Sequence, residues 1–366
     1  MISPMARPLR YGLIGAGMMG QEHIRNIALL DGAQVVAIHD PDPGMSAAAQ
    51  ALAPGARQAA TVEALLDMAE IDALVIASPN HLHLDQLERI AALRPLPVLV
   101  EKPVFTEAAQ EGRIAALAEY PALLWVAMEY RYMPPIAEFL ARADAATGGV
   151  RMLTIREHRF PFLDKVGGWN RFNRFTGGTM VEKCCHFFDL MRLALGAEPV
   201  RVMASAGQAV NHLDEAVNGA APDIWDHGYV LVDFDGGARA MLELCMFAEG
   251  SRYQEELSAV GPTGKIEAFV PGPGRFWPDR LGPAPIPRVV VSPRAPRGPV
   301  EIEVPVDPDL LEAGDHNGAT FYQHRLFAKA VTNGTAAEVG LAEGAAAVRI
   351  GLAAQRSARE GRAIDL

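Results

Sequence analysis

The sequence predicts an α/β protein: a doubly wound parallel sheet at the N-terminus, followed by an α+β domain with a mostly antiparallel open sheet. Three observations lead to this prediction. Apolar runs of strand length alternate with helical stretches between residues 9 and 125, which is typical of a parallel sheet. After residue 129 such runs follow one another across turn sequences, which indicates hairpins. The length of 366 residues also favours two domains, placed at 1–128 and 129–366.

In the N-terminal domain, local signals mark the ends of the elements. The apolar run at 73–77 stops at Ser78-Pro79-Asn80, and Thr61 is an N-cap for the helix after it. Strands are expected at 9–14, 34–39, 73–77, 97–100 and 123–128, and helices at 18–30, 45–52, 62–68, 83–93 and 107–119.

In the C-terminal domain, the turn sequences 235–237 and 261–264 separate successive strands. The Pro/Gly/Arg-rich segment 271–300 is expected to be a long loop around a single strand. Strands are expected at 151–160, 228–234, 238–245, 255–260, 265–269 and 288–291, and helices at 178–195, 319–332 and 341–359.

Composition excludes several classes of function. The chain is 50% hydrophobic and 21% charged, which is ordinary for a globular protein, and its net charge of −11 argues against nucleic acid or an anionic membrane as partner. Cys184, Cys185 and Cys245 form no CxxC pattern and are expected to be reduced thiols. Neither a signal peptide nor a membrane span is evident, so a cytoplasmic protein is expected.

A glycine-rich motif predicts the cofactor site. Gly15-Ala16-Gly17-Met18-Met19-Gly20 follows a predicted strand and opens a predicted helix, as in the dinucleotide-binding fingerprint of a Rossmann domain. The first glycine allows a tight turn, the second lets the backbone approach the pyrophosphate, and the third lets helix and strand pack closely. Asp40 ends the second strand, where a carboxylate binds the adenosine ribose and repels a 2′-phosphate. NAD is therefore favoured over NADP.

Two further strand ends are expected to line the same crevice, at Ser78-Pro79-Asn80 and Glu101-Lys102-Pro103. Pro103 ends its strand and leaves Lys102 extended. Helix capping and surface polarity remain the alternative for the polar residues at 80–83. The cofactor contacts predicted from the sequence are Gly15, Gly17, Met18, Met19, Gly20, Asp40, Ser78, Asn80, His83, Glu101, Lys102 and Arg131.

The segment 177–190 supplies the predicted catalytic groups. Glu182 and His186 are four residues apart, so they share one face of a helix. A neutral imidazole can take the proton of a hydroxyl group as hydride leaves the carbon, and the ammonium of Lys102 can stabilise the developing oxyanion. Two alternatives stay open: a half-buried structural His186, or a metal site that includes Asp189. No metal is expected, because hydride transfer to NAD needs none.

These motifs, together with the segment from 314 to 361, resemble the Gfo/Idh/MocA oxidoreductase family over essentially the whole chain. The resemblance implies a Rossmann domain, an open sheet that forms oligomer contacts, a catalytic Lys102 with a cis bond to Pro103, and His186 as acid/base. It also implies a homodimer or homotetramer. The family usually has aspartate four residues before the histidine, where this chain has Glu182, and Lys183 beside it is a second departure.

The basic and aromatic segment 156–174 suggests the class of substrate. Sugar rings stack on aromatic faces, and arginine forks prefer carboxylate or phosphate. A solvated basic loop and contact with the cofactor are the alternatives to a polyhydroxylated substrate, with or without an anionic group. The predicted substrate contacts are Arg159, Lys165, Trp169, Asn170, Arg171, Asn173, Arg174, Glu182 and His186.

The sequence thus predicts an NAD-dependent oxidoreductase that moves hydride between the nicotinamide and a secondary hydroxyl of a sugar, cyclitol or sugar acid. The first alternative is an NAD-dependent glycosidase that oxidises its substrate transiently and eliminates the leaving group. The second is a non-catalytic NAD(H) sensor.

Overall fold

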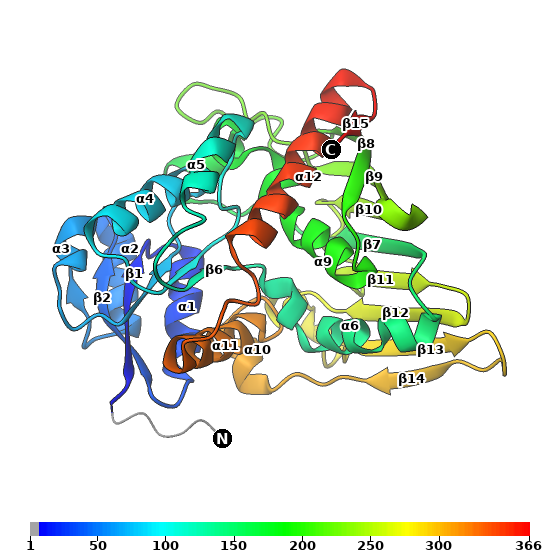
Figure 1. Cartoon of the computed structure of the whole chain (residues 1–366), viewed down its shortest axis with the longest axis horizontal. Coiled ribbons are helices and arrows are strands. Elements are labelled where there is room, and N and C mark those ends of the chain that lie inside the picture. Colours follow the sequence, from blue (N-terminus) through cyan, green and yellow to red (C-terminus); the bar gives the residue numbers. More distant parts are fainter. Residues whose placement is uncertain (1–6) are drawn as a thin grey trace.

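The computed structural model describes residues 7–366. Its N-terminal part is built on a six-stranded parallel sheet (Figure 1). The strand order is β3-β2-β1-β4-β5-β6. Every residue of β4, β5 and β6 is buried, which explains why these strands are continuous apolar runs. The strands are β1 (Leu9–Ile14), β2 (Ala33–His39), β3 (Arg57–Gln58), β4 (Ala73–Ile76), β5 (Val98–Val100) and β6 (Leu124–Val126).

The helices that connect these strands are α1 (Met18–Ala28), α2 (Pro43–Leu52), α3 (Val62–Leu66), α4 (His83–Leu93) and α5 (Glu111–Ala116). Thr61 caps α3 as predicted, because its side chain accepts a hydrogen bond of 3.1 Å from the backbone of Ala64. The helix expected at 107–119 is shorter, consisting of a 3₁₀ turn at Ala108–Gln110 and α5. Strand–helix alternation in a parallel sheet confirms the predicted Rossmann-type class.

The C-terminal domain contains a nine-stranded sheet in the order β14-β13-β12-β11-β7-β10-β9-β8-β15. Only β7 and β10 pair in parallel among these strands, so the sheet is mostly antiparallel as predicted. The strands are β7 (Met152–His158), β8 (Pro199–Gly207), β9 (His227–Phe234), β10 (Arg239–Cys245), β11 (Glu255–Val260), β12 (Gly264–Val270), β13 (Arg288–Pro293), β14 (Val300–Glu303) and β15 (Ile364–Asp365). The sequence did not predict β8, β14 or β15.

The helices of this part are α6 (Pro134–Thr147), α7 (Asn173–Thr176), α8 (Thr179–Glu182), α9 (Cys185–Leu195), α10 (Pro308–Ala313), α11 (Ala319–Asn333) and α12 (Leu341–Glu360). The single helix expected at 178–195 is interrupted after Glu182, so the two predicted catalytic residues lie on α8 and α9. Helices α6, α7 and α10 were not predicted. No helix within residues 7–366 is long and apolar enough to cross a membrane.

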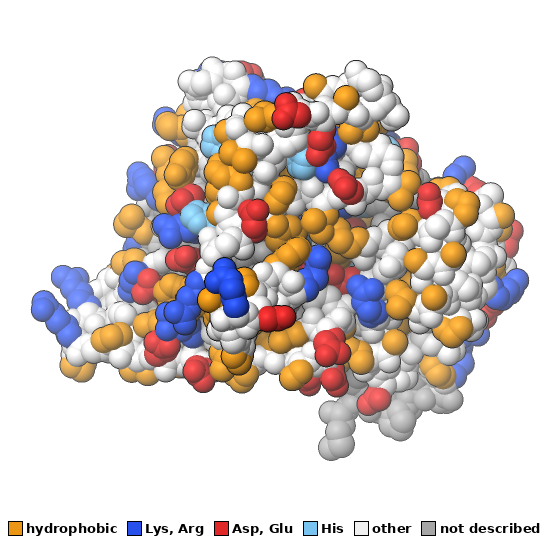
Figure 2. Space-filling model, turned by 180° about the vertical axis from the view of Figure 1, so that it is seen from behind, with side chains coloured by type: hydrophobic (Ala, Val, Ile, Leu, Met, Phe, Trp, Pro, Cys, Tyr) orange, Lys and Arg blue, Asp and Glu red, His pale blue; other side chains and the backbone are white. Residues whose placement is uncertain are grey.

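Helix α12 runs along the junction between the two sheets (Figure 1). Its glycines allow close contact on both sides, because a Cβ at Gly344 would lie 2.8 Å from the side chain of Val126, and one at Gly351 would lie 2.6 Å from the carbonyl oxygen of Met180. The chain before α12 also joins the edge strand β6, where Val126 N donates to Val339 O at 2.9 Å. Seen from behind, the surface is hollowed between the two domains, with basic and acidic side chains around the hollow (Figure 2).

Candidate active site

A cavity lies where the carboxyl ends of the parallel strands face the C-terminal domain. Together with the solvent space at its open mouth, it contains about 800 Å³ that no protein atom fills. The residues predicted from the sequence that line it are Met18, Met19, Glu101, Lys102, Arg159, Lys165, Glu182 and His186. The fold therefore brings predicted catalytic, cofactor and substrate residues from both domains to one cavity.

The glycine-rich loop has the geometry that a dinucleotide requires. Gly15 has φ +91°, and a Cβ on it would lie 2.4 Å from the backbone nitrogen of Ser78. A Cβ on Gly20 would lie 2.2 Å from Gly15 O, whereas one on Gly17 would meet no atom within 4 Å. Space is thus left free at Gly17, at the N-terminus of α1, where backbone N–H groups attract phosphate. The residues present fit a bound NAD, with the pyrophosphate at this loop.

Asp40 lies at the end of β2 and contacts the glycine-rich loop. Its Oδ2 accepts a hydrogen bond of 2.6 Å from Ala16 N, and its Oδ1 accepts one of 2.8 Å from Asp42 N. Each carboxylate oxygen has a second lone pair, so Asp40 can still accept from ribose hydroxyls. The same side chain therefore orders the loop and is available to the cofactor.

Two other predicted cofactor residues connect strand ends to each other. His83 is buried, with Nδ1 2.8 Å from Pro103 O and Nε2 2.9 Å from Ser78 O. Ser78 Oγ donates to Gln86 Oε1 at 2.6 Å. His83 consequently supports the loops after β4 and β5 from behind, and the Lys102–Pro103 peptide is cis, as the resemblance implied.

Glu101 supports Lys102 from a buried position. Its Oε1 lies 3.0 Å from Nε2 of His23, whose Nδ1 lies 2.8 Å from Nε2 of His324. Burial alone would raise the pKa of Glu101, but the hydrogen bond from His23 and the charge of Lys102 outweigh it, and the pKa is lowered. Glu101 is therefore an anion next to Lys102.

Lys102, Glu182 and His186 meet at the cavity. Lys102 Nζ donates a hydrogen bond of 2.9 Å to the carbonyl oxygen of Glu182. The carboxylate of Glu182 accepts from Asn80 Nδ2. The ring of His186 is stacked on that of Tyr130, with 4.1 Å between centroids and 9° between planes. Three of the predicted groups thus have fixed orientations.

The charges of Lys102 and His186 are set by their surroundings. Burial lowers the pKa of Lys102, but the carboxylates of Glu182 and Glu101 more than compensate and raise it. The pKa of His186 is lowered well below 6.5, first by burial and then by the charges of Lys102 and Lys183. At neutral pH the cavity therefore holds a charged lysine beside a neutral imidazole.

The sequence did not predict a second group of residues around Tyr130, of which Tyr130 and Lys183 line the cavity. Lys183 Nζ donates to Tyr130 Oη and lies 2.8 Å from Oε1 of Glu157, which is fully buried. Burial, followed by repulsion from Glu157, raises the pKa of the neighbouring Glu255 to about 7. A signal existed for part of this group, because Tyr130 follows the end of β6 as Lys102 follows the end of β5.

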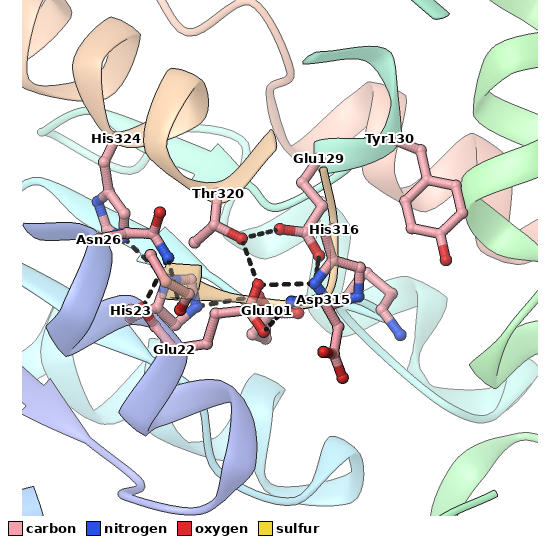
Figure 3. Close-up of polar contacts among 12 residues, drawn as sticks. Glu22, His23, Asn26, Glu101, Glu129, Tyr130, Asp315, His316, Thr320 and His324 are labelled. Carbon is pink, nitrogen blue, oxygen red and sulfur yellow. Dashed lines mark hydrogen bonds and ion pairs between the residues drawn. The ribbon is translucent and has the colours of Figure 1, made fainter. Parts of the chain in front are cut away.

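A third group, also missed, joins Glu22, Glu129 and His316 (Figure 3). Nδ1 of His316 lies 2.8 Å from Glu22 Oε1 and 3.6 Å from Glu129 Oε1, and Thr320 Oγ1 lies 2.6 Å from Glu129 Oε2. The three could hold a metal ion by geometry. However, although burial lowers the pKa of His316, the two carboxylates raise it to about 9. The protonated imidazole is thus itself the cation between them.

The predicted substrate segment is divided by the fold. Arg159 and Lys165 line the cavity, and Nζ of Lys165 lies 4.8 Å from the ring centre of Trp169. The other four contact protein: Asn170 donates to Leu163 O, Arg171 pairs with Asp164 and Glu215, Asn173 contacts Asp223, and Arg174 lies over Phe172 and Phe175.

The predicted cofactor residue Arg131 also has a protein partner. Its Nε lies 3.0 Å from Oδ2 of Asp189 and its Nη2 lies 2.5 Å from Oδ1. Asp189 therefore pairs with Arg131 and does not line the cavity. The metal site that the sequence left open as an alternative thus lacks one of its ligands.

A Rossmann domain with a glycine-rich loop, facing a lysine and a neutral histidine from two domains, defines a nicotinamide-dependent oxidoreductase. Comparison with known families agrees. The model described as "Oxidoreductase family, NAD-binding Rossmann fold" matches residues 9–127, and the one described as "Oxidoreductase family, C-terminal alpha/beta domain" matches residues 147–366. The chain therefore belongs to the Gfo/Idh/MocA oxidoreductase family and is an NAD-dependent enzyme.

Individual proteins are also similar to this chain. Inositol 2-dehydrogenase of Rhizobium meliloti (strain 1021) is 30% identical over 71% of this chain and 75% of that protein. The rhizopine catabolism protein MocA of Rhizobium meliloti is 30% identical over 74% and 79%. A levoglucosan dehydrogenase, solved with NADH and levoglucosan, shares the fold with a TM-score of 0.79 and 20% identity, covering 98% of this chain and 99% of that chain.

Proposed function

We propose that this protein is an NAD-dependent dehydrogenase that oxidises a secondary hydroxyl of a cyclitol or sugar. The observation that carries the proposal is the meeting of Lys102, Glu182 and His186 in one cavity with the residues of the cofactor loop. The names of the relatives, an inositol 2-dehydrogenase and a levoglucosan dehydrogenase, support it. No observation in residues 7–366 favours the glycosidase or the sensor.

The side chains have separate tasks. NAD, when bound at the glycine-rich loop, supplies the hydride acceptor. His186 is neutral and accepts the hydroxyl proton at a ring nitrogen. Lys102 has three N–H donors and gives one to Glu182 O, which leaves two for the substrate oxygen. Glu182 holds Asn80 with one carboxylate oxygen and can accept a substrate hydroxyl with the other.

A substrate panel tests this function. Purified protein is mixed with NAD and with cyclitols, free sugars, sugar acids and glycosides, and NADH absorbance and product release are recorded. Net NADH from a free cyclitol or sugar supports the dehydrogenase. Glycoside cleavage without net NADH would identify the glycosidase instead, and NAD binding without any turnover would identify the sensor.

We also propose a homodimer or homotetramer formed through the open face of the nine-stranded sheet. Large apolar side chains are exposed there, including Met203 on β8 at 47%, and Tyr229 and Leu231 on β9 at 55% and 50%. Exposed apolar surface of this kind marks a protein interface. Sedimentation analysis tests the proposal, and a monomer at all concentrations would contradict it.

The cysteines support a reducing compartment. Cys184, Cys185 and Cys245 are all free thiols, and the first two are buried. Structural disulfides belong to oxidising compartments. We therefore expect the enzyme to work in the cytoplasm, and fractionation of cells that express the full chain checks this.

A further inference from the structure

The wall of the cavity contributed by the C-terminal domain is basic. Arg159, Lys165 and Lys183 line it, and Lys102 approaches from the opposite domain. Lysine is scarce in this chain, with five lysines among 33 lysine and arginine residues, yet three of the five line this cavity. Such a concentration of a rare residue type in a cavity points to a requirement of the ligand.

One of these cations has no anionic partner in the part of the chain that the structure describes. Lys183 Nζ lies 2.8 Å from Glu157 Oε1, and Arg159 Nη1 lies 3.5 Å from the same oxygen. Lys102 donates to a backbone carbonyl. The ammonium of Lys165, by contrast, makes neither a hydrogen bond nor an ion pair with any residue in 7–366, and it lies 4.8 Å from the ring centre of Trp169.

The electrostatics at Lys165 favour an anionic ligand. Burial lowers the pKa of this lysine, and repulsion from Lys102 and Arg159 lowers it further, so that the attraction of Glu182 and Glu101 does not compensate. An ammonium in this position is stabilised when a ligand brings a negative charge to it. A neutral polyol, which offers only hydroxyl groups, removes much less of this repulsion.

Arg159 is held in an orientation that suits the same ligand. Its guanidinium lies over the ring of Phe160, with 4.3 Å from Cζ to the ring centre, and its Nε donates to Phe160 O at 3.2 Å. The contact with Glu157 is long, at 3.5 Å, and the side chain is only 14% exposed. A planar fork fixed in this way matches the two oxygens of a carboxylate.

We propose that the substrate is a polyhydroxylated carboxylic acid, a sugar acid or a carboxylated cyclitol, whose carboxylate binds Lys165 and Arg159 while the hydroxyl to be oxidised faces Lys102 and His186. This inference rests on the proposed dehydrogenase function. One unpartnered cation balances the single charge of a carboxylate. A phosphomonoester carries about −1.5 to −2 at neutral pH and would leave charge uncompensated in a cavity that also contains Glu101 and Glu182.

The test compares matched substrates. Each neutral sugar or cyclitol is assayed beside its carboxylic acid and its phosphate ester, and kcat and KM are measured for NADH formation. We expect kcat/KM to be at least about tenfold higher for the acid, equivalent to 1.4 kcal/mol. Preference for the neutral compound or the phosphate ester overturns the inference and leaves the dehydrogenase standing. NADH formation from no member overturns the proposed function itself.

Variants locate the carboxylate. In Lys165→Met we expect KM for the acid to rise about tenfold or more, and the preference for acid over neutral substrate to disappear, because the unpartnered charge is gone. Lys165→Arg should retain part of the preference. The control is Lys329→Met, an exposed lysine on α11 outside the cavity, which should match the wild type. NAD affinity measured by calorimetry verifies that each variant is folded, and an unchanged preference in Lys165→Met contradicts the inference.

Discussion

The two walls of the cavity differ in how their charges are held. On the wall formed by the N-terminal strand ends and the start of α11, Glu101 contacts His23 and Glu22 pairs with His316. On the wall formed by the segment after β7, Lys165 has no such partner among the described residues. The first wall is organised before any ligand arrives, whereas the second leaves a charge for the ligand to satisfy. Changes to the first wall should affect every substrate alike, and changes to the second should affect substrate choice.

The strongest test of the organised wall is Lys102→Met. Loss of the ammonium removes a donor to the developing oxyanion, so turnover should fall by about 10²–10³ or more for every substrate. NAD affinity should stay near that of the wild type. Steady-state kinetics and calorimetry measure the two effects, with Lys329→Met as the matched lysine control. Near-normal turnover would show that Lys102 has no catalytic role.

Next in size is the effect of His316→Gln on stability. The pKa of His316 is raised from 6.5 to about 9 in the folded protein, so protonation stabilises the fold. This contribution, about 3 kcal/mol, is fully present below pH 6.5 and is lost as pH rises through about 9. The variant should therefore lose the most stability at acid pH and differ least from the wild type above pH 9.

Urea unfolding across this pH range measures the effect of His316→Gln. The control is His227→Gln, whose imidazole pairs with Asp226 but is 39% exposed, so it should cost less than about 1 kcal/mol. A loss of stability in His316→Gln that did not depend on pH would show that His316 is not protonated between its two carboxylates.

The smallest expected effect is that of Asp40→Ala. Removing the carboxylate should weaken NAD binding about tenfold and relax discrimination against NADP, because we propose that Asp40 binds the ribose hydroxyls and repels a 2′-phosphate. Asp42→Ala is the control: Asp42 caps α2 through Met45 N at 2.9 Å and should alter stability but not cofactor choice. Titration with both cofactors tests this, and unchanged affinities in Asp40→Ala would contradict the ribose assignment.

Strands with a strong local pattern were predictable, and strands without one were not. The runs at β4 and β5 are apolar throughout because both faces of the sheet are covered, and this burial is visible as continuous hydrophobic sequence. Most side chains of β8 and β14 are exposed or only half-buried, so neither strand has the continuous apolar run that marks β4 and β5. Their place in the sheet is set by pairing with β9 and β13, which the sequence does not record.

The same limit applies to the candidate site. Lys102 could be found because it lies two residues beyond the end of an apolar strand, and His186 because Glu182 lies four residues before it. His316, which meets Glu22 from a distant part of the chain, had no comparable local signal. The segment from 159 to 174 mixes basic, amide and aromatic residues along its whole length, and only its folding shows that Arg159 and Lys165 face the cavity while Arg171 pairs with Asp164.

The sequence by itself determined the local features of the fold. These are the apolar runs that form buried strands, the position of the glycine-rich turn, and the polar residues at the ends of strands. These follow from hydrophobic periodicity and backbone sterics, which act over a few residues. The tertiary structure decided which charges have partners. That depends on distances between residues far apart in the chain, and it is why Glu101 contacts His23 while Lys165 has no anionic partner among residues 7–366.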